Sequence, residues 1–178
     1  QFAVAGDAAL GLSDDLLAGG HPYYDYEHSD ALRFADEAYS GFVLARVNRA
    51  PLGTLRALFD NDRAKTITAL PLVHLGIALK LMGDEPRAEK AVAEAFAKEV
   101  DRPWYLGDYG SDLRDTALMV ALVHKYGLAK PEYDARVFEL ARSLTSQQRE
   151  ADSEQKRYGF HWNWLSTQEQ IAIARLGR

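Results

Sequence analysis

The pattern of apolar and polar positions divides the chain into helices of two kinds. Residues 72–81 and 116–123 are apolar on almost every side, and a helix with this pattern is buried over most of its circumference. Residues 85–98 and 132–144 instead combine charged positions with apolar positions spaced three and four apart. That spacing is typical of a helix that covers a core with one face. We therefore predict buried helices packed against covering helices.

The clearest start and end signals surround the second apolar stretch, within residues 108–127. Ser111 is a candidate N-cap, and Asp112 and Asp115 place negative charge at the positive end of the helix dipole. Gly127 is a candidate C-cap. This segment is expected to be a buried helix around which the other helices pack.

The first helix is expected to run from about residue 30 to Arg49, because Pro51 then prevents its continuation. Apolar positions at helical spacing predict its buried face. The residues assigned to that face are Leu32, Ala35, Tyr39, Phe42, Val43 and Val47.

A short amphipathic helix is expected over 52–59, followed by a turn at residues 61–62. The next helix is expected over 66–82, and it tolerates Pro71 only in its first turn or at a kink. In the covering helix that follows, the inward positions are predicted to be Ala88, Ala91, Val92, Ala95 and Phe96.

The C-terminal third is expected to contain a second covering helix, a polar loop and a final helix. Residues 146–157 are strongly charged and are interpreted as the loop, and the aromatic run 158–164 as a short extended piece. Ser166 and Glu169 then have the spacing of a capping box. The inward positions of the covering helix are predicted to be Tyr133, Val137, Leu140, Ala141 and Leu144.

The alternation of the two kinds of helix is the main indication of fold. Buried helices are expected to begin near residues 31, 67, 112 and 166, and covering helices near residues 52, 85 and 132. This order is a series of αα-hairpins that repeats every roughly 40 to 50 residues. It favours an all-α fold, part of an α/α toroid with inner and outer helices, over a tetratricopeptide array. We expect an irregular lead-in over 1–30 and a toroid segment over 31–178 that belongs to a larger protein.

Composition narrows the function classes. The formal net charge is −5 at pH 7 and no basic stripe is present, so nucleic acid is not an expected partner. No apolar run approaches the roughly 18 residues of a membrane helix, so no membrane insertion of this segment is expected. The sequence has no Cys, which excludes disulfides, thiolate metal sites and a Cys nucleophile within it.

Residue chemistry alone predicts no catalytic, cofactor-binding or metal site. Asp112 and Asp115 lie three apart on one helix face, but matching of their charge to the helix dipole accounts for them without catalysis. His74 and His124 lie on apolar helices and His161 lies between aromatic residues, so packing is the default interpretation of all three. The tyrosine-rich segment 21–26 is a candidate stacking site or an edge of the core.

Four stretches in order resemble the thioester (complement-like) domain of bacterial α2-macroglobulins. The two most specific are Tyr109-Gly-Ser-Asp-Leu-Arg-Asp-Thr-Ala117 and Trp164-Leu-Ser-Thr-Gln-Glu169. The other two are Phe34-Ala-Asp-Glu-Ala-Tyr39 with Val43-Leu-Ala-Arg46, and Leu70-Pro-Leu-Val-His-Leu-Gly-Ile-Ala-Leu-Lys80 with Gly83-Asp84. The resemblance covers the chain from about residue 30 to its end.

This resemblance implies an α/α toroid that is not an enzyme, within a broad-spectrum inhibitor that traps proteases after they cut a bait region. Target proteases and the other domains of the parent chain are the implied partners. A periplasmic or cell-envelope location is implied as well. The Cys-Leu-Glu-Gln thioester motif of the family is missing here, so no thioester residue is assigned.

Two alternatives remain open. An α/α-toroid glycoside hydrolase or lyase would use aromatic residues with an acid at one end of the toroid. Its candidate residues are Tyr23, Tyr24, Trp104 and Trp162 with Asp108 or Asp112. A helical-repeat interaction scaffold would instead present an open concave face.

Overall fold

The computed structural model describes residues 28–99, 102–103, 106, 108, 110–158 and 165–177, with the backbone alone for 147–158. In this part of the chain every regular element is helical, so the predicted all-α fold class is confirmed. The chain divides into two compact units, Gln1–Asp108 and Tyr109–Arg178, each of which is considered by itself.

The helices begin close to where the apolar pattern places them. The first unit contains α2 (Ser29–Ala45), α3 (Leu52–Ala57), the π-helical turn η1 (Leu58–Asp62), the 3₁₀ turn η2 (Arg63–Lys65), α4 (Leu70–Leu81) and α5 (Glu85–Ala97). The second unit contains α6 (Asp112–Lys125), α7 (Pro131–Tyr158) and α8 (Thr167–Leu176). Among these described residues no helix is long and apolar enough to cross a membrane.

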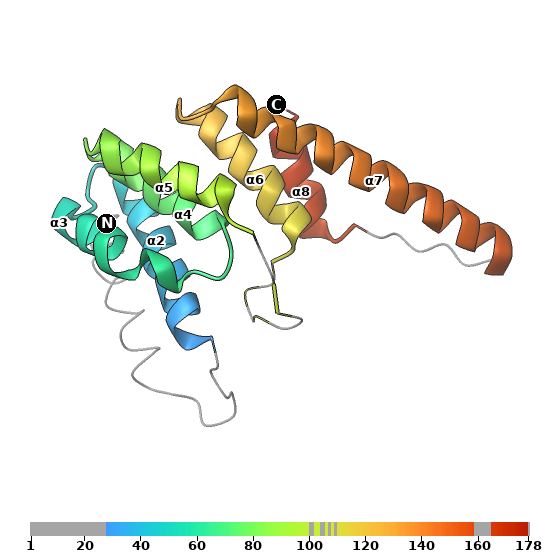
Figure 1. The fold of residues 1–178 in the computed structure, drawn as a ribbon, viewed down its shortest axis with the longest axis horizontal. Coiled ribbons are helices and arrows are strands. Elements are labelled where there is room, and N and C mark those ends of the chain that lie inside the picture. Colours follow the sequence, from blue (N-terminus) through green and yellow to red (C-terminus); the bar gives the residue numbers. More distant parts are fainter. Residues whose placement is uncertain are drawn as a thin grey trace. The chain divides into compact units, whose positions relative to one another are not determined.

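The apolar helix α4 forms the centre of the first unit, where it packs against both α2 and α5 (Figure 1). Val73, Leu75, Ile77 and Leu79 are fully buried. Each such side chain contributes about 1.5–3 kcal/mol relative to remaining exposed. The five predicted inward residues of α5 are all buried against it, which confirms the covering role of that helix. The predicted alternation of inner and outer helices is therefore present here.

The predicted buried face of α2 is largely wrong. Tyr39, Val43 and Val47 are 54%, 42% and 64% exposed, and Phe42 alone of the predicted face is fully buried. The buried face is built mostly from small residues around Phe34, and at Gly41 a Cβ atom would lie only 2.7 Å from Leu55 Cδ2. Small residues give a weak periodic signal, although they allow neighbouring helices to approach closely. The segment consequently has apolar residues on an exposed face as well as on the buried one.

Three helices end in the same way, with a residue in the left-handed region that favours Gly. These residues are Asn48, Gly83 and Gly127, with φ of 56°, 90° and 66°. In each case the next amide bonds back to the last turn of the helix, as in a Schellman motif. The bonds are Arg49 N–H to the Leu44 carbonyl (2.9 Å), Asp84 to Leu79 (2.8 Å) and Leu128 to Val123 (2.8 Å). Gly127, the predicted C-cap of α6, lies one residue beyond the C-cap Tyr126, and α2 ends at Ala45, before the expected residue 49.

The turn expected at residues 61–62 is wrong, because these residues belong to the π-helical turn η1. Arg63 holds this widened turn in place. Its Nη1 donates to the Phe59 and Asp60 carbonyls at 3.0 and 3.1 Å, and its Nε donates to Glu94 Oε2 at 3.1 Å. The guanidinium also lies 4.8 Å from the centre of the Phe59 ring.

The start of α4 is later than expected, at Leu70 in place of residue 66. Thr66 is buried and its hydroxyl donates to the Thr68 carbonyl at 2.7 Å, which favours a turn over a helix before this point. Pro71 therefore falls in the first turn of α4, as its ring requires.

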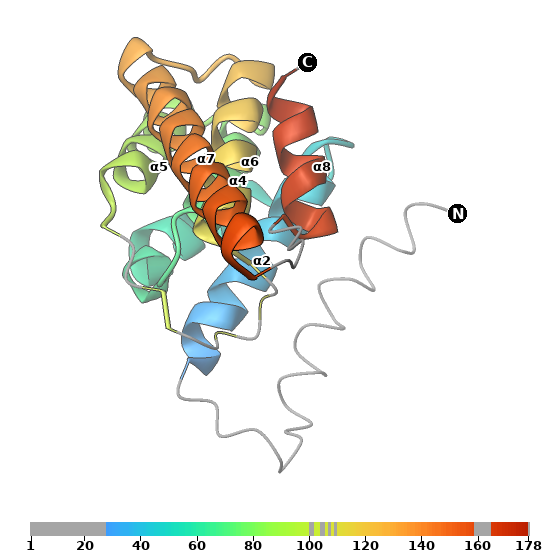
Figure 2. The ribbon, with the colours of Figure 1, turned by 90° about the vertical axis from the view of Figure 1, so that its right-hand side faces the viewer.

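In the second unit, α6 packs against both α7 and α8, as Figure 2 shows. Its residues from Leu113 to Val123 are all at least half-buried, so the predicted central helix is confirmed. Ala117 packs with Leu140 of α7 and Ala172 of α8. The helix α8 is less buried than expected, since Ile171 is 45% exposed and only Ala172 is fully buried.

The loop expected over 146–157 is wrong, because α7 continues as one helix of 28 residues through Tyr158. Its C-terminal half extends beyond α6 and α8 (Figure 1). The sequence has no Gly or Pro between Pro131 and Gly159, and Gln, Arg, Glu, Ala and Lys are strong helix formers. High polarity in this stretch therefore does not mark the end of the helix.

Two Gly-to-Ala substitutions test the close packing at α4. A Cβ atom at Gly76 would lie 2.9 Å from Val92 Cγ2 and 3.0 Å from the Ala88 carbonyl oxygen, whereas a Cβ atom at Gly53 meets nothing within 4 Å. We expect Gly76→Ala to lower the free energy of unfolding by about 1–2 kcal/mol through overpacking. The control Gly53→Ala should raise it by roughly 0.5–1 kcal/mol. Urea unfolding measures both, and equal effects would contradict the packing described.

Candidate functional site

The two most specific sequence motifs meet in the second unit, where α6 and α8 begin. Ser111 is the N-cap of α6, and its Oγ accepts the Arg114 amide at 3.1 Å. The same hydroxyl donates to Glu169 Oε1 of α8 at 2.7 Å. Residues 58 positions apart in sequence are thus hydrogen-bonded at the starts of neighbouring helices.

Glu169 also completes the capping box of α8. Its Oε2 accepts the Ser166 amide at 2.8 Å, and Ser166 Oγ accepts the Glu169 amide at 3.3 Å. The predicted capping box is therefore confirmed. Partial burial acts to raise the pKa of Glu169, but hydrogen bonds from Ser111 and Ser166 and the nearby Arg114 outweigh it and lower the pKa. The carboxylate is held in its ionised form.

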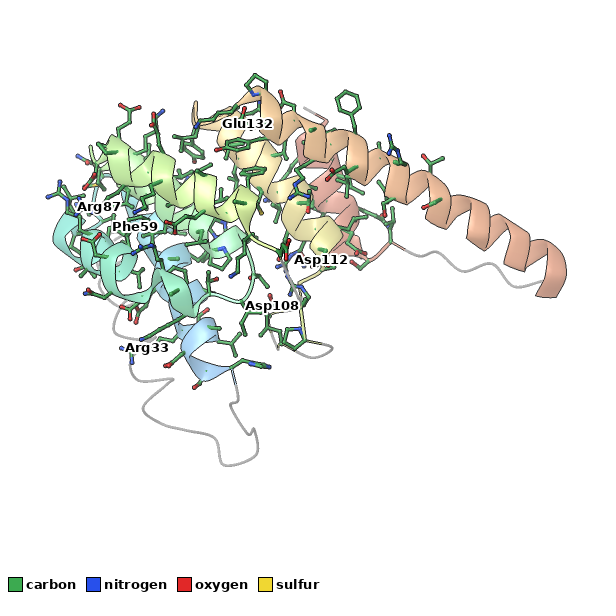
Figure 3. All side chains as sticks on the ribbon, in the orientation of Figure 1. Arg33, Phe59, Arg87, Asp108, Asp112 and Glu132 are labelled. Atoms are coloured by element: carbon green, nitrogen blue, oxygen red, sulfur yellow. The ribbon has the colours of Figure 1, made fainter. Side chains whose placement is uncertain are left out.

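The candidate carboxylate pair on α6 is divided between two environments. Asp115 is buried, and its Oδ1 accepts Nε and Nη2 of Arg114 at 2.8 and 2.7 Å. Asp112, labelled in Figure 3, is exposed at the first position of the helix. A general acid and base pair requires two carboxyls that share a cleft, and this arrangement instead serves the helix start.

The candidate histidines are engaged in local contacts. His74 is half-buried, stacks on Phe42 and meets Tyr39 edge-on, with both ring centroids 5.2 Å away. His124 Nε2 lies 2.6 Å from Asp134 Oδ1, and joins the end of α6 to the first turn of α7. In the described part of the chain no three His, Cys, Asp or Glu residues are grouped to hold a metal ion. His161 lies outside that part.

The residues proposed for a carbohydrate-active enzyme are only partly described. Asp108 accepts two hydrogen bonds from Arg102 Nη1, at 2.8 Å to each oxygen. Its carboxylate is therefore ion-paired, and Asp112 lies in the other unit. The aromatic residues of that hypothesis lie outside the described residues, namely Tyr23, Tyr24, Trp104 and Trp162.

Sequence reasoning missed a charged cluster in the first unit, centred on buried Asp84. This residue is the N-cap of α5, and its Oδ1 accepts the Arg87 amide at 3.4 Å. Its Oδ2 accepts Arg56 Nε at 2.5 Å and Arg87 Nη1 at 3.2 Å. Arg87, labelled at the start of α5 in Figure 3, also donates to both oxygens of Asp60 at 3.1 and 2.9 Å.

The cluster ties three elements of the first unit together, namely α3 through Arg56, η1 through Asp60 and α5 through Asp84. The hydrogen bond from Arg56 is the main cause that lowers the pKa of Asp84, so its carboxylate is ionised. The turn Gly83-Asp84 before Pro86 could have identified the cap. The partners 28 and 27 residues away could not be read from local spacing.

Comparisons with known proteins place the chain among bacterial proteins of one kind. No protein-family model matches it. An alpha-2-macroglobulin of Xylella fastidiosa is 55% identical over 177 residues, which cover 99% of this chain and 10% of that protein. An alpha-2-macroglobulin of Escherichia coli is 40% identical over 154 residues, covering 85% of this chain and 8% of that protein. The chain thus spans about a tenth of the length of these relatives.

Solved structures agree with the curated relatives. The alpha-2-macroglobulin of Escherichia coli activated by porcine elastase matches with a TM-score of 0.77, 35% identity, 96% of this chain and 14% of that chain. Its native conformation matches with a TM-score of 0.76, 35% identity, 97% of this chain and 10% of that chain. The Salmonella protein reacted with methylamine matches with a TM-score of 0.73, 35% identity, 96% of this chain and 10% of that chain.

The Asp84 cluster yields a prediction for stability. Asp84→Ala removes the cap of α5 and the acceptor of Arg56, so we expect the free energy of unfolding at pH 7 to fall by roughly 1–2 kcal/mol. Asp84→Asn keeps a capping oxygen without the charge and should lose less. Urea unfolding of the three proteins measures the difference, and equal stabilities would contradict a structural role for the carboxylate.

The same variants predict a pH dependence. Folding lowers the pKa of Asp84, so its stabilising contribution is complete above the usual carboxyl pKa of about 4. The contribution is lost as the pH falls through the lower folded value. The stability gap between the unmodified chain and Asp84→Asn should therefore stay constant down to about pH 4 and shrink as the pH falls further. A gap that widened on acidification would contradict this sign.

Proposed function

Because this chain belongs to the bacterial alpha-2-macroglobulin family and matches one segment of its members, we propose that it serves a protease trap as a structural, non-enzymatic domain. The parent inhibitor would capture a protease after the protease cuts a bait region. The observation that carries the proposal is 55% identity over almost the whole chain to an alpha-2-macroglobulin.

The internal architecture of each unit suits a structural role. The described polar clusters serve helix caps and ion pairs, and the apolar helices α4 and α6 are packed on more than one side. The native and the elastase-activated Escherichia coli alpha-2-macroglobulin match with TM-scores of 0.76 and 0.77, and the trypsin-activated protein matches with 0.70. This supports a segment that keeps its fold while other parts of a trap rearrange around the protease.

The exposed face of α2 supports contact with further parts of a longer chain. Tyr39 and Val43 of α2 and Val47, just beyond its end, follow one another at a spacing of four and remain largely exposed. A contiguous apolar stripe on a surface helix marks a contact surface more often than scattered apolar residues do. In this proposal other parts of the parent cover the stripe, and they are the first partners of this segment.

Thioester chemistry and location belong to the proposal as well. One of the matching structures is a Salmonella alpha-2-macroglobulin reacted with methylamine, and in this proposal methylamine would add to a thioester of the parent of this chain. A thioester-free parent would trap by shape alone. The parent is proposed to work in the periplasm or at the cell envelope, which fractionation of the source cells would test.

The full-length parent provides the test of trapping. After incubation with porcine elastase, a cage leaves the active site of the protease open, so cleavage of a short peptide substrate should persist. Cleavage of a large protein substrate should fall by at least roughly tenfold, because it cannot enter the cage. If cleavage of both substrates were lost, the parent would be an active-site inhibitor. If cleavage of both substrates were unchanged, the trapping proposal would be wrong. Intact mass after methylamine treatment reports the thioester.

The stripe on α2 yields a second prediction. In the 178-residue chain alone, Val43→Lys with Val47→Lys should change the free energy of unfolding by less than about 0.5 kcal/mol, because both side chains are exposed. In the full-length parent the same pair should lower the melting temperature. Phe138→Lys, at a residue 73% exposed on α7, is the control for an added charge. An unchanged parent would mean that the stripe faces water.

A further inference from the structure

The caps of α6 and α8 share one carboxylate. Oε1 of Glu169 accepts a hydrogen bond from the hydroxyl of Ser111, the N-cap of α6. Oε2 of Glu169 accepts a hydrogen bond from the amide of Ser166, the N-cap of α8. Ser111 in turn accepts the Arg114 amide. One connected path of hydrogen bonds therefore runs from the first turn of α6 to the first turn of α8.

The direction of these bonds makes the two caps interdependent. A hydroxyl has one hydrogen and two lone pairs. An ionised carboxylate cannot donate, so the hydrogen of Ser111 points to Glu169, which leaves a lone pair for the Arg114 amide. A hydroxyl that donates to a charged group is also a better acceptor, because hydrogen bonds in a chain polarise one another. Loss of Glu169 thus weakens the cap of α6 without touching Arg114 N–H.

Within the part of the chain that the structure describes, α8 packs mainly against α6. It has 10 residues, fewer than the roughly 12 to 15 that an isolated helix needs in water. Ala172 is its single fully buried residue, and Ile173 and Leu176 pack at the edge of the small cluster with Leu113 and Leu118 of α6. Among the described residues, its order therefore depends on packing against α6.

We propose that Ser111 and Glu169 form a latch that couples the docking of α8 to the order of the first turn of α6. When α8 undocks, the N-cap of α6 loses its oriented hydroxyl and the first turn frays. The latch thereby converts the position of α8 into a change at the first turn of α6. This inference does not depend on the proposed function.

The test substitutes a residue on α8 and measures hydrogen exchange of a backbone amide on α6, and the reverse. Glu169→Gln has one carbonyl oxygen in place of two carboxylate oxygens, so it cannot serve Ser111 and Ser166 in the same way. In the full 178-residue chain, we expect hydrogen exchange of the Arg114 amide to accelerate by roughly tenfold. Conversely, Ser111→Ala should accelerate exchange of the Glu169 amide on α8.

Gln170→Ala is the matched control. Gln170 Nε2 donates to the Leu165 carbonyl at 2.8 Å, which is a local bond at the same end of α8. Its loss should leave the Arg114 amide unchanged. If Glu169→Gln accelerates exchange within α8 but not at Arg114, the helix frays independently and the proposal is overturned.

A double-mutant cycle keeps the proposal testable if Glu169→Gln loosens the whole second unit. For a latch, Ser111→Ala combined with Glu169→Gln should lower the melting temperature little more than the larger single change does, because both remove the same bond. Melting-temperature losses that simply add would mean that the two caps act separately, and would overturn the latch.

Discussion

An apolar helix cannot leave any of its sides in water, and this constraint organises both units. In the first unit α4 carries Val73, Leu75, Ile77 and Leu79 in full burial, so α2 and α5 must cover it on different sides. In the second unit α6 meets α7 and α8 for the same reason. The small residue Gly76 lets α5 approach α4 closely. The order of inner and outer helices follows from this requirement, because each apolar helix needs amphipathic neighbours.

Charged residues join particular turns of neighbouring helices, whereas apolar packing alone does not determine which turns lie together. Asp84 caps α5 and receives Arg56 from α3, while Glu169 caps α8 and receives Ser111 from α6. In both places a carboxylate at a helix start satisfies local amides and also reaches a second element. Packing of small side chains permits sliding, whereas a shared cap fixes which turns lie together. The polar groups of these two clusters are therefore engaged in holding helix starts and neighbouring elements together.

The helices and caps were predictable because their signals are local. Helix ends can be located to within a few residues from Ser111, from Gly127 and from the spacing of Ser166 and Glu169. The buried face of α2 was not predictable by the same reading, because Ala and Gly contribute little to periodicity while large exposed residues contribute strongly. Nor could a polar helix be told from a polar loop in the second half of α7. Long-range pairs such as Arg56 with Asp84 depend on tertiary packing, and no local pattern contains them.

The central claim is that this segment keeps its packed helices while the protein around it rearranges. Hydrogen–deuterium exchange of the full-length parent, before and after cleavage by elastase, tests it most directly. The account predicts that amides in the middle of α4 and α6 stay protected to the same degree in both states, with changes confined to exposed faces such as the stripe on α2. Loss of protection in α4 or α6 after cleavage would show that the segment refolds, and would contradict the account.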